Sequence, residues 1–119
     1  MRRGTLEWQT GVAERFVKKL SITVNERMNG ATDRFRTELS RSRGEEPAVI
    51  RALLSLRKEF AFLADAVDLP VLPERDRASY RALVTEQADK VQKSLEDSAR
   101  NDRTGKLASI LRGHRVNAF

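Results

Sequence analysis

Apolar residues recur at helical spacing in the middle of the chain. Successive members of one stripe are four or three residues apart, as in a helix seam that packs against a neighbour: Val49, Leu53, Leu56, Phe60, Leu63 and Val67. Ile50, Leu54 and Ala61 widen this stripe to more than half of the circumference, and such a wide apolar arc normally packs on two sides. Pro47 suits the first helical position. We therefore predict a central apolar helix over residues 47–67.

Two prolines, Pro70 and Pro73, end this pattern and predict an extended linker over residues 68–73. A narrower apolar stripe follows, made of Tyr80, Leu83, Val84, Ala88, Val91 and Leu95. It predicts a surface helix over residues 74–100, with Glu74 and Asp76 at the positive end of its dipole. After a break at residues 101–105 we expect a short C-terminal helix over 104–112 and a basic tail.

The first 43 residues carry a long apolar stripe in steps of four or three: Trp8, Val12, Phe16, Leu20, Val24, Met28, Ala31, Phe35 and Leu39. The β-branched run Ile22-Thr23-Val24 and the turn-forming pair Asn29-Gly30 argue against one continuous helix. We expect basic N-terminal helices over residues 5–43, as two helices or one kinked helix. A single helix, or a short strand at residues 20–25, stays open.

These elements predict an all-α fold, namely a small antiparallel bundle of four to five helices around residues 47–67. The length of 119 residues fits one helical domain over 1–119, and the 39% hydrophobic and 34% charged residues fit a folded protein. No uncharged apolar run is long enough to span a membrane, and no secretory signal is evident. We expect a cytoplasmic protein.

Composition argues against an enzyme. The chain has no cysteine and a single histidine, His114, which removes thiolate and paired-histidine metal sites. Arg103-Thr-Gly-Lys106 has only the end of a phosphate-binding loop, because Arg100 and Leu107 stand where that motif needs Gly and Ser or Thr. We expect no catalytic residues, metal or cofactor, and no small-molecule substrate is evident.

The net charge of +6 favours a polyanionic partner. Arg27, Arg34 and Arg41 recur every seven residues and form one row of the N-terminal helical region, while Arg36 and Arg43 form a second row on the other flank of its apolar face. Two such rows predict contacts with nucleic-acid phosphates. The alternative is a set of ordinary surface ion pairs, because Asp33 and Glu38 lie within reach.

A second basic cluster lies near the C-terminus and consists of Arg100, Arg103, Lys106, Arg112 and Arg115, opposed in the sequence by Asp102 alone. We include these five residues in the predicted phosphate-binding set. Phe62 is a predicted partner contact, because its helix face also carries Ser55, Lys58 and Asp65.

The sequence thus favours a non-catalytic nucleic-acid-binding helical protein, a small subunit of a larger nucleoprotein assembly that contacts other protein subunits or itself. DNA and RNA are not distinguished. The alternative is a protein–protein adaptor or structural subunit, as in a virion or secretion system, whose basic charge is incidental.

A third interpretation starts from residues 20–26, Leu-Ser-Ile-Thr-Val-Asn-Glu, which resemble the strand and helix start of ribbon-helix-helix DNA-binding proteins. Gly44 and residues 48–54 resemble the turn and second helix of that family. The resemblance implies that Ser21, Thr23 and Asn25 read bases from a dimeric ribbon. The segment between strand and glycine is about one helical turn longer than the family pattern.

Overall fold

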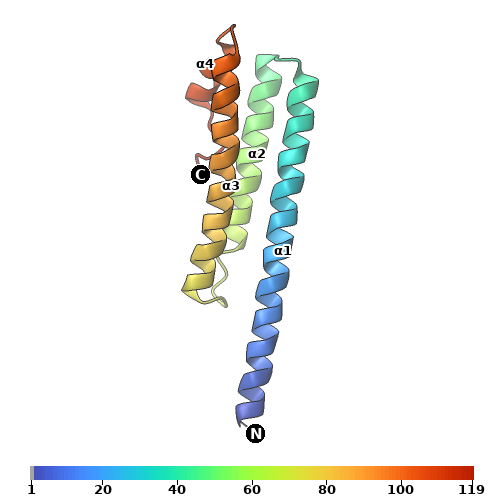
Figure 1. The fold of residues 1–119 in the computed structure, drawn as a ribbon, viewed down its shortest axis with the longest axis vertical. Coiled ribbons are helices and arrows are strands. Elements are labelled where there is room, and N and C mark those ends of the chain that lie inside the picture. Colours follow the sequence, from blue (N-terminus) through green and yellow to red (C-terminus); the bar gives the residue numbers. More distant parts are fainter. Residues whose placement is uncertain (1) are drawn as a thin grey trace.

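Four helices make up the fold: α1 (Arg2–Ser42), α2 (Glu46–Ala66), α3 (Glu74–Asn101) and α4 (Lys106–Gly113). The computed structural model describes the backbone of residues 2–119 and the side chains of residues 15–119. The predicted all-α fold is confirmed, with four helices packed together and no strand in the described backbone. The principal extents are 69 × 22 × 19 Å, because α1 continues beyond the connection between α2 and α3 (Figure 1).

The N-terminal region is one helix, so the expectation of two helices or a kink is wrong. The pair Asn29-Gly30 lies inside α1 without a break, although glycine costs about 1 kcal/mol in a helix interior. Met28 and Ala31 are both 3% exposed, one on each side of that pair. Because the apolar stripe continues in phase through the pair, burial against the other helices outweighs the local turn signal.

The strand required by the ribbon-helix-helix resemblance does not form, because residues 20–26 lie within α1. The Thr23 hydroxyl donates to the carbonyl of Lys19 at 2.9 Å, and the Asn25 amide donates to the carbonyl of Ser21 at 3.0 Å. Both side chains therefore bond to their own helix.

α2 is buried along most of its length: Val49, Ala52, Leu53, Leu56, Phe60 and Leu63 are all less than 9% exposed. It packs against both α1 and α3, whereas α1 and α3 contact each other much less. Figure 1 shows the chain rising through α1, descending through α2 and rising again through α3. The turn into α2 is tight, with Arg43 at φ 52° and Gly44 at φ 76° in the left-handed region that favours glycine.

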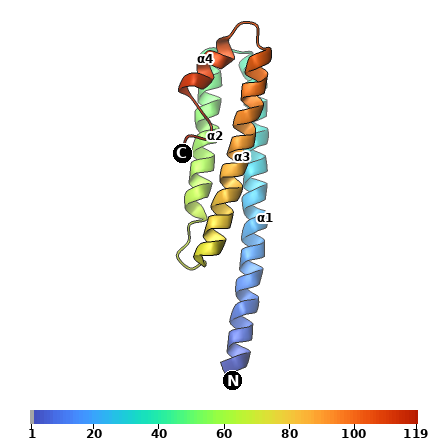
Figure 2. The ribbon, with the colours of Figure 1, turned by 60° about the vertical axis from the view of Figure 1, so that its left-hand side comes forward.

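The C-terminal residues return along α2 and α3 below α4 (Figure 2). Val116 is fully buried, and its backbone N–H donates to the Gln92 side-chain oxygen at 3.1 Å. The Asn117 amide donates to Asp89 at 2.9 Å, and the Phe119 ring stacks on Phe60 with a centroid separation of 6.3 Å. The tail expected only to be basic is therefore packed against the bundle.

Several other expectations differ in detail. α1 ends at Ser42, α2 spans 46–66, α3 reaches Asn101 and α4 spans 106–113. Phe16, expected on the inward stripe, is 47% exposed, because α1 there passes the end of the bundle and no neighbouring helix covers that side. The expected inward positions of Trp8 and Val12 lie outside the described side chains. Within the described residues, no helix is long and apolar enough to cross a membrane.

Replacing Tyr80 tests the contact between α3 and the lower part of α1. Its hydroxyl donates to the backbone carbonyl of Val17 at 2.6 Å. Tyr80→Phe removes this hydrogen bond and keeps the ring, so we expect the free energy of unfolding at neutral pH to fall by about 0.5–1.5 kcal/mol in urea titrations. Burial, and then the charge of Asp76, raise the pKa of Tyr80 above 10.0.

The raised pKa of Tyr80 means that the folded state favours the neutral hydroxyl. The contribution of Tyr80 to the free energy of unfolding is therefore complete below about pH 10, and it is lost as pH rises through the folded pKa. The chain has one tyrosine, so tyrosinate absorbance reports it directly. A midpoint at or below 10.0 would contradict the buried contact.

Packing of the C-terminal tail is tested by Val116→Ala. The substitution removes two methyl groups from a fully buried side chain, and we expect a decrease of about 1–3 kcal/mol in the free energy of unfolding. Val71→Ala is the matched control, because Val71 is 81% exposed, and its effect should stay within about 0.5 kcal/mol. Equal effects of the two substitutions would mean that the tail does not pack.

Candidate nucleic-acid interface

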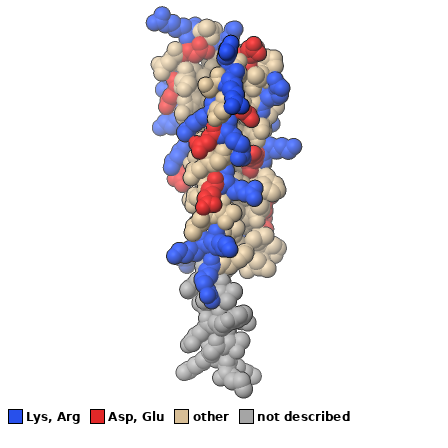
Figure 3. All heavy atoms as spheres, turned by 90° about the vertical axis from the view of Figure 1, so that its right-hand side faces the viewer, with Lys and Arg blue, Asp and Glu red and all other residues tan. Residues whose placement is uncertain are grey.

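The outer surface of α1 is basic. Residues 15–43 contain eight Lys or Arg and three Asp or Glu, and all eight basic side chains are exposed. Figure 3 shows this side, with blue Lys and Arg side chains along its length and fewer red carboxylates between them. Because α1 is one uninterrupted helix as far as Ser42, seven of these cations stand on one straight support, and Arg43 follows in the turn.

The first predicted row, Arg27, Arg34 and Arg41, runs along the side of α1 that borders α2. Arg34 shows this directly, because its Nη2 lies 3.0 Å from both carboxylate oxygens of Glu59 on α2. Both side chains are well exposed, so this ion pair contributes at most about 1 kcal/mol. Neither Arg27 nor Arg41 makes an ion pair within the described residues. Glu38, which lies within reach of this row in the sequence, makes no ion pair with a described residue.

The second predicted row, Arg36 and Arg43, is not a row. Arg36 lies on the opposite flank of α1, where it lines a groove shared with α3. Its contact with Asp33 is long, at 3.9 Å between two side chains that are about three-quarters exposed. Arg43 has left the helix, and its backbone makes the turn into α2. The buried face of α1 lies between Arg36 and the first row, which separates them.

Sequence reasoning missed a basic group at the lower end of the described part of α1, formed by Arg15, Lys18 and Lys19. Lys18 and Lys19 are exposed, and neither makes an ion pair with a described residue. The three basic residues are visible in the sequence. The break expected around residues 22–30 concealed that they share a helix with Arg27.

The C-terminal cluster is partly neutralised. Arg100 lies 2.9 Å from Asp97, and Arg115 lies 3.6 Å from Glu96, so the expectation that Asp102 alone opposes this cluster is wrong. Both contacts depend on the fold, since α3 brings Asp97 one turn below Arg100 and the returning tail brings Arg115 to Glu96. Arg100, Arg112 and Arg115 line one shallow hollow of about 430 Å³ between α3 and α4.

The fold also joins the two basic sets at one end of the bundle. Arg43 and Lys106 line a single hollow of about 400 Å³ between the turn after α1 and the start of α4. Arg103 is exposed in the neighbouring turn after α3 and makes no ion pair within the described chain. This end therefore carries cations from segments that are about sixty residues apart in the sequence.

Asp102 organises the turn between α3 and α4. Its carboxylate accepts hydrogen bonds from the Thr104 hydroxyl at 2.8 Å, the Thr104 N–H at 3.1 Å and the Leu107 N–H at 3.1 Å. These bonds, the Thr104 hydroxyl first, hold the pKa of Asp102 below 3.8. Residues 103–106, which match only the end of the phosphate-binding loop motif, thus form a capped turn. This turn positions Lys106 at the start of α4.

Phe62 is 65% exposed on α2, which makes it one of the most exposed large apolar side chains of the described chain. No group of three or more metal-ligating residues occurs among the described side chains. Comparison with known proteins finds no matching family model, no matching curated protein and no matching solved structure. The function is therefore inferred from the residues and their geometry.

The capping role of Asp102 is tested by Asp102→Ala. Removal of the carboxylate should shift the Leu107 amide resonance and weaken its protection from hydrogen exchange, because that N–H then lacks its acceptor. Glu86→Ala, at an exposed site without an ion pair in the described chain, should leave Leu107 unchanged. Because the pKa of Asp102 is lowered, the bonds persist above pH 3.8 and break as pH falls through the folded pKa. A Leu107 shift that titrates at or above 3.8 would contradict the capped turn.

Proposed function

We propose that the protein binds nucleic acid, without catalysis, through phosphate contacts along the exposed surface of α1. The observation that supports this proposal is the excess of cations on one continuous helix, seven against three carboxylates over residues 15–42. Lys and Arg that lack protein partners can neutralise phosphates and release counterions, which drives nucleic-acid binding. The scaffold for this interface is an antiparallel bundle organised around α2.

Spacing along α1 also supports the proposal. Lys19, Arg27 and Arg41 are exposed and make no ion pair within the described chain. By helical rise the first and last of them are about 33 Å apart, so one helix can contact phosphates over a long stretch of backbone. Arg34 is a weaker candidate because Glu59 already holds it.

The second end of the interface is the group of cations around the α1–α2 and α3–α4 turns. Arg43 and Lys106 share a hollow there, next to Arg103. Phosphates that follow α1 towards its C-terminus meet this group, which lets both predicted basic sets act on one partner. The ion-paired Arg100 and Arg115 contribute less.

Exposed apolar side chains support a role for partner proteins as well, as in a subunit of a larger nucleoprotein assembly. Phe62 is 65% exposed and Ile22 is 51% exposed. An adaptor or structural subunit without nucleic acid is the second candidate function, and these two side chains are the observation that favours it.

A salt series tests the phosphate contacts. The variant Lys19→Gln, Arg27→Gln and Arg41→Gln should bind nucleic acid more weakly whatever the sequence. The slope of log affinity against log salt should become shallower by about 0.9 for each duplex phosphate that the variant no longer neutralises. Fluorescence anisotropy of labelled DNA and RNA over a range of salt concentrations measures both quantities.

The matched control removes three charges elsewhere, by Lys58→Gln, Arg75→Gln and Lys93→Gln. These side chains are exposed on α2 and α3 and make no ion pair within the described chain. The control should keep a slope close to that of the unaltered protein. Equal decreases in affinity for both variants would show a general charge effect, and no binding at about 50 mM salt would leave the adaptor function in place.

A further inference from the structure

A groove lies between α1 and α3, which contact each other less than either contacts α2. α1 and α2 pack closely together, and the outer side of α2 and α3 is covered by α4 and the C-terminal tail. Between α1 and α3 a groove of about 520 Å³ remains, lined by residues of both helices from Thr32 to Ser40 and from Gln87 to Ser98. By helical rise the groove is about 12–16 Å long.

The floor of this groove is apolar and its rim is polar. Phe35, Val91 and Leu95, each less than 9% exposed, form the floor together with Leu39. The rim carries the hydroxyls of Ser40, Ser94 and Ser98 and the side-chain amide of Gln87. None of these four polar side chains is hydrogen-bonded to another described residue, so each can bond to a ligand.

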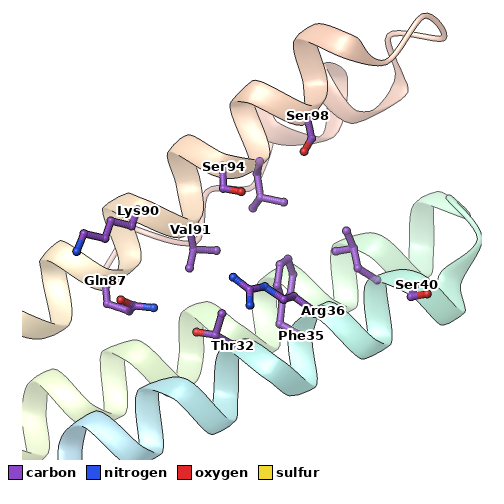
Figure 4. A pocket seen from close by; sticks show the side chains of 11 residues that line it. Thr32, Phe35, Arg36, Ser40, Gln87, Lys90, Val91, Ser94 and Ser98 are labelled. Carbon is purple, nitrogen blue, oxygen red and sulfur yellow. The ribbon is translucent and has the colours of Figure 1, made fainter.

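The charge of the groove is positive, because Arg36 and Lys90 line it and no carboxylate does. Figure 4 shows the Arg36 side chain extending from α1 into the space below α3, with Thr32 and Gln87 near it on opposite walls. Lys90 makes no ion pair within the described chain, and Arg36 has only its long contact with Asp33. Both cations are therefore available to an anion at the groove.

We propose that this groove binds an unpaired base of a single-stranded nucleic acid, whose flanking phosphates contact Arg36 and Lys90. The inference rests on the proposed function, and it adds the strandedness of the partner. A base presents apolar faces and hydrogen-bonding edges, which match the apolar floor and the hydroxyl and amide rim. A base in a duplex cannot enter, because its edge is paired and its faces are stacked.

Little apolar surface is accessible in the groove, because its floor residues are nearly buried by their own neighbours. At about 12–16 Å the groove is as long as two to three helical turns, which leaves a partner helix little surface to bury. The volume lies within the range of roughly 300–1,000 Å³ that is usual for small-ligand pockets. The groove therefore favours a nucleotide over a helix.

The experiment compares the affinities of the full chain for a short oligodeoxythymidine strand and for its duplex with oligodeoxyadenosine, at one salt concentration. We expect Ser94→Trp, which fills the groove, to weaken single-strand binding by about 10-fold or more and to leave duplex binding within about 2-fold. Ser94→Ala keeps the groove open and should preserve at least most of the single-strand affinity. Circular dichroism verifies that each variant is helical.

A second pair of variants decides the matter if Ser94→Trp does not fold. Arg36→Gln and Arg27→Gln each remove one exposed charge from α1, but only Arg36 lines the groove. Arg27→Gln should weaken duplex and single-strand binding to a similar extent, whereas Arg36→Gln should weaken single-strand binding several-fold more than duplex binding.

The outcomes separate this inference from the proposed function. If the protein binds strand and duplex and the groove variants change neither binding more than their controls, the groove site is overturned and the phosphate interface of α1 stands. If the unaltered protein binds neither nucleic acid at low salt, the proposed function itself fails and the groove inference fails with it.

Discussion

The packing of α2 against two neighbouring helices accounts for much of the buried core. Its apolar arc is too wide for one neighbour to cover, so α1 packs on one side and α3 on the other. Phe60 has no exposed surface and Leu53 is 1% exposed, whereas Ile50, Leu54 and Ala61 at the edges of the arc are half-buried. The C-terminal tail adds to this cover, because Phe119 stacks on Phe60. Every other feature of the bundle follows from this arrangement.

One consequence is the separation of α1 from α3. Both helices pack against α2 and contact each other less, as where the Tyr80 hydroxyl donates to the carbonyl of Val17. Farther along the two helices a groove remains, with Phe35, Val91 and Leu95 at its floor. The other consequence is that, within the described side chains, the face of α1 turned away from the bundle is exposed and carries Lys19, Arg27 and Arg41.

Much of the fold could be predicted from the sequence, because apolar spacing and prolines are local signals. Pro47 and Pro73 mark the starts of α2 and α3 to within one residue. The continuity of α1 could not be predicted in this way. A turn signal at Asn29-Gly30 and an apolar stripe through the same residues conflict locally, and only packing of Met28 and Ala31 against the other helices resolves the conflict. The candidate interface was less predictable, because an exposed charge carries no information about its distant partner.

The sequence by itself determined the helical class, the positions of α2 and α3 and the excess of basic residues, since these depend on composition and on spacing within each segment. Tertiary structure alone decided which cations stand free. Glu59 holds Arg34 across twenty-five residues, the returning tail brings Arg115 to Glu96, and Arg43 meets Lys106 at one end of the bundle. It also created the α1–α3 groove. These contacts and shared hollows join segments that are far apart in the chain. They arise because α1 and α3 both pack against α2, which brings distant residues together.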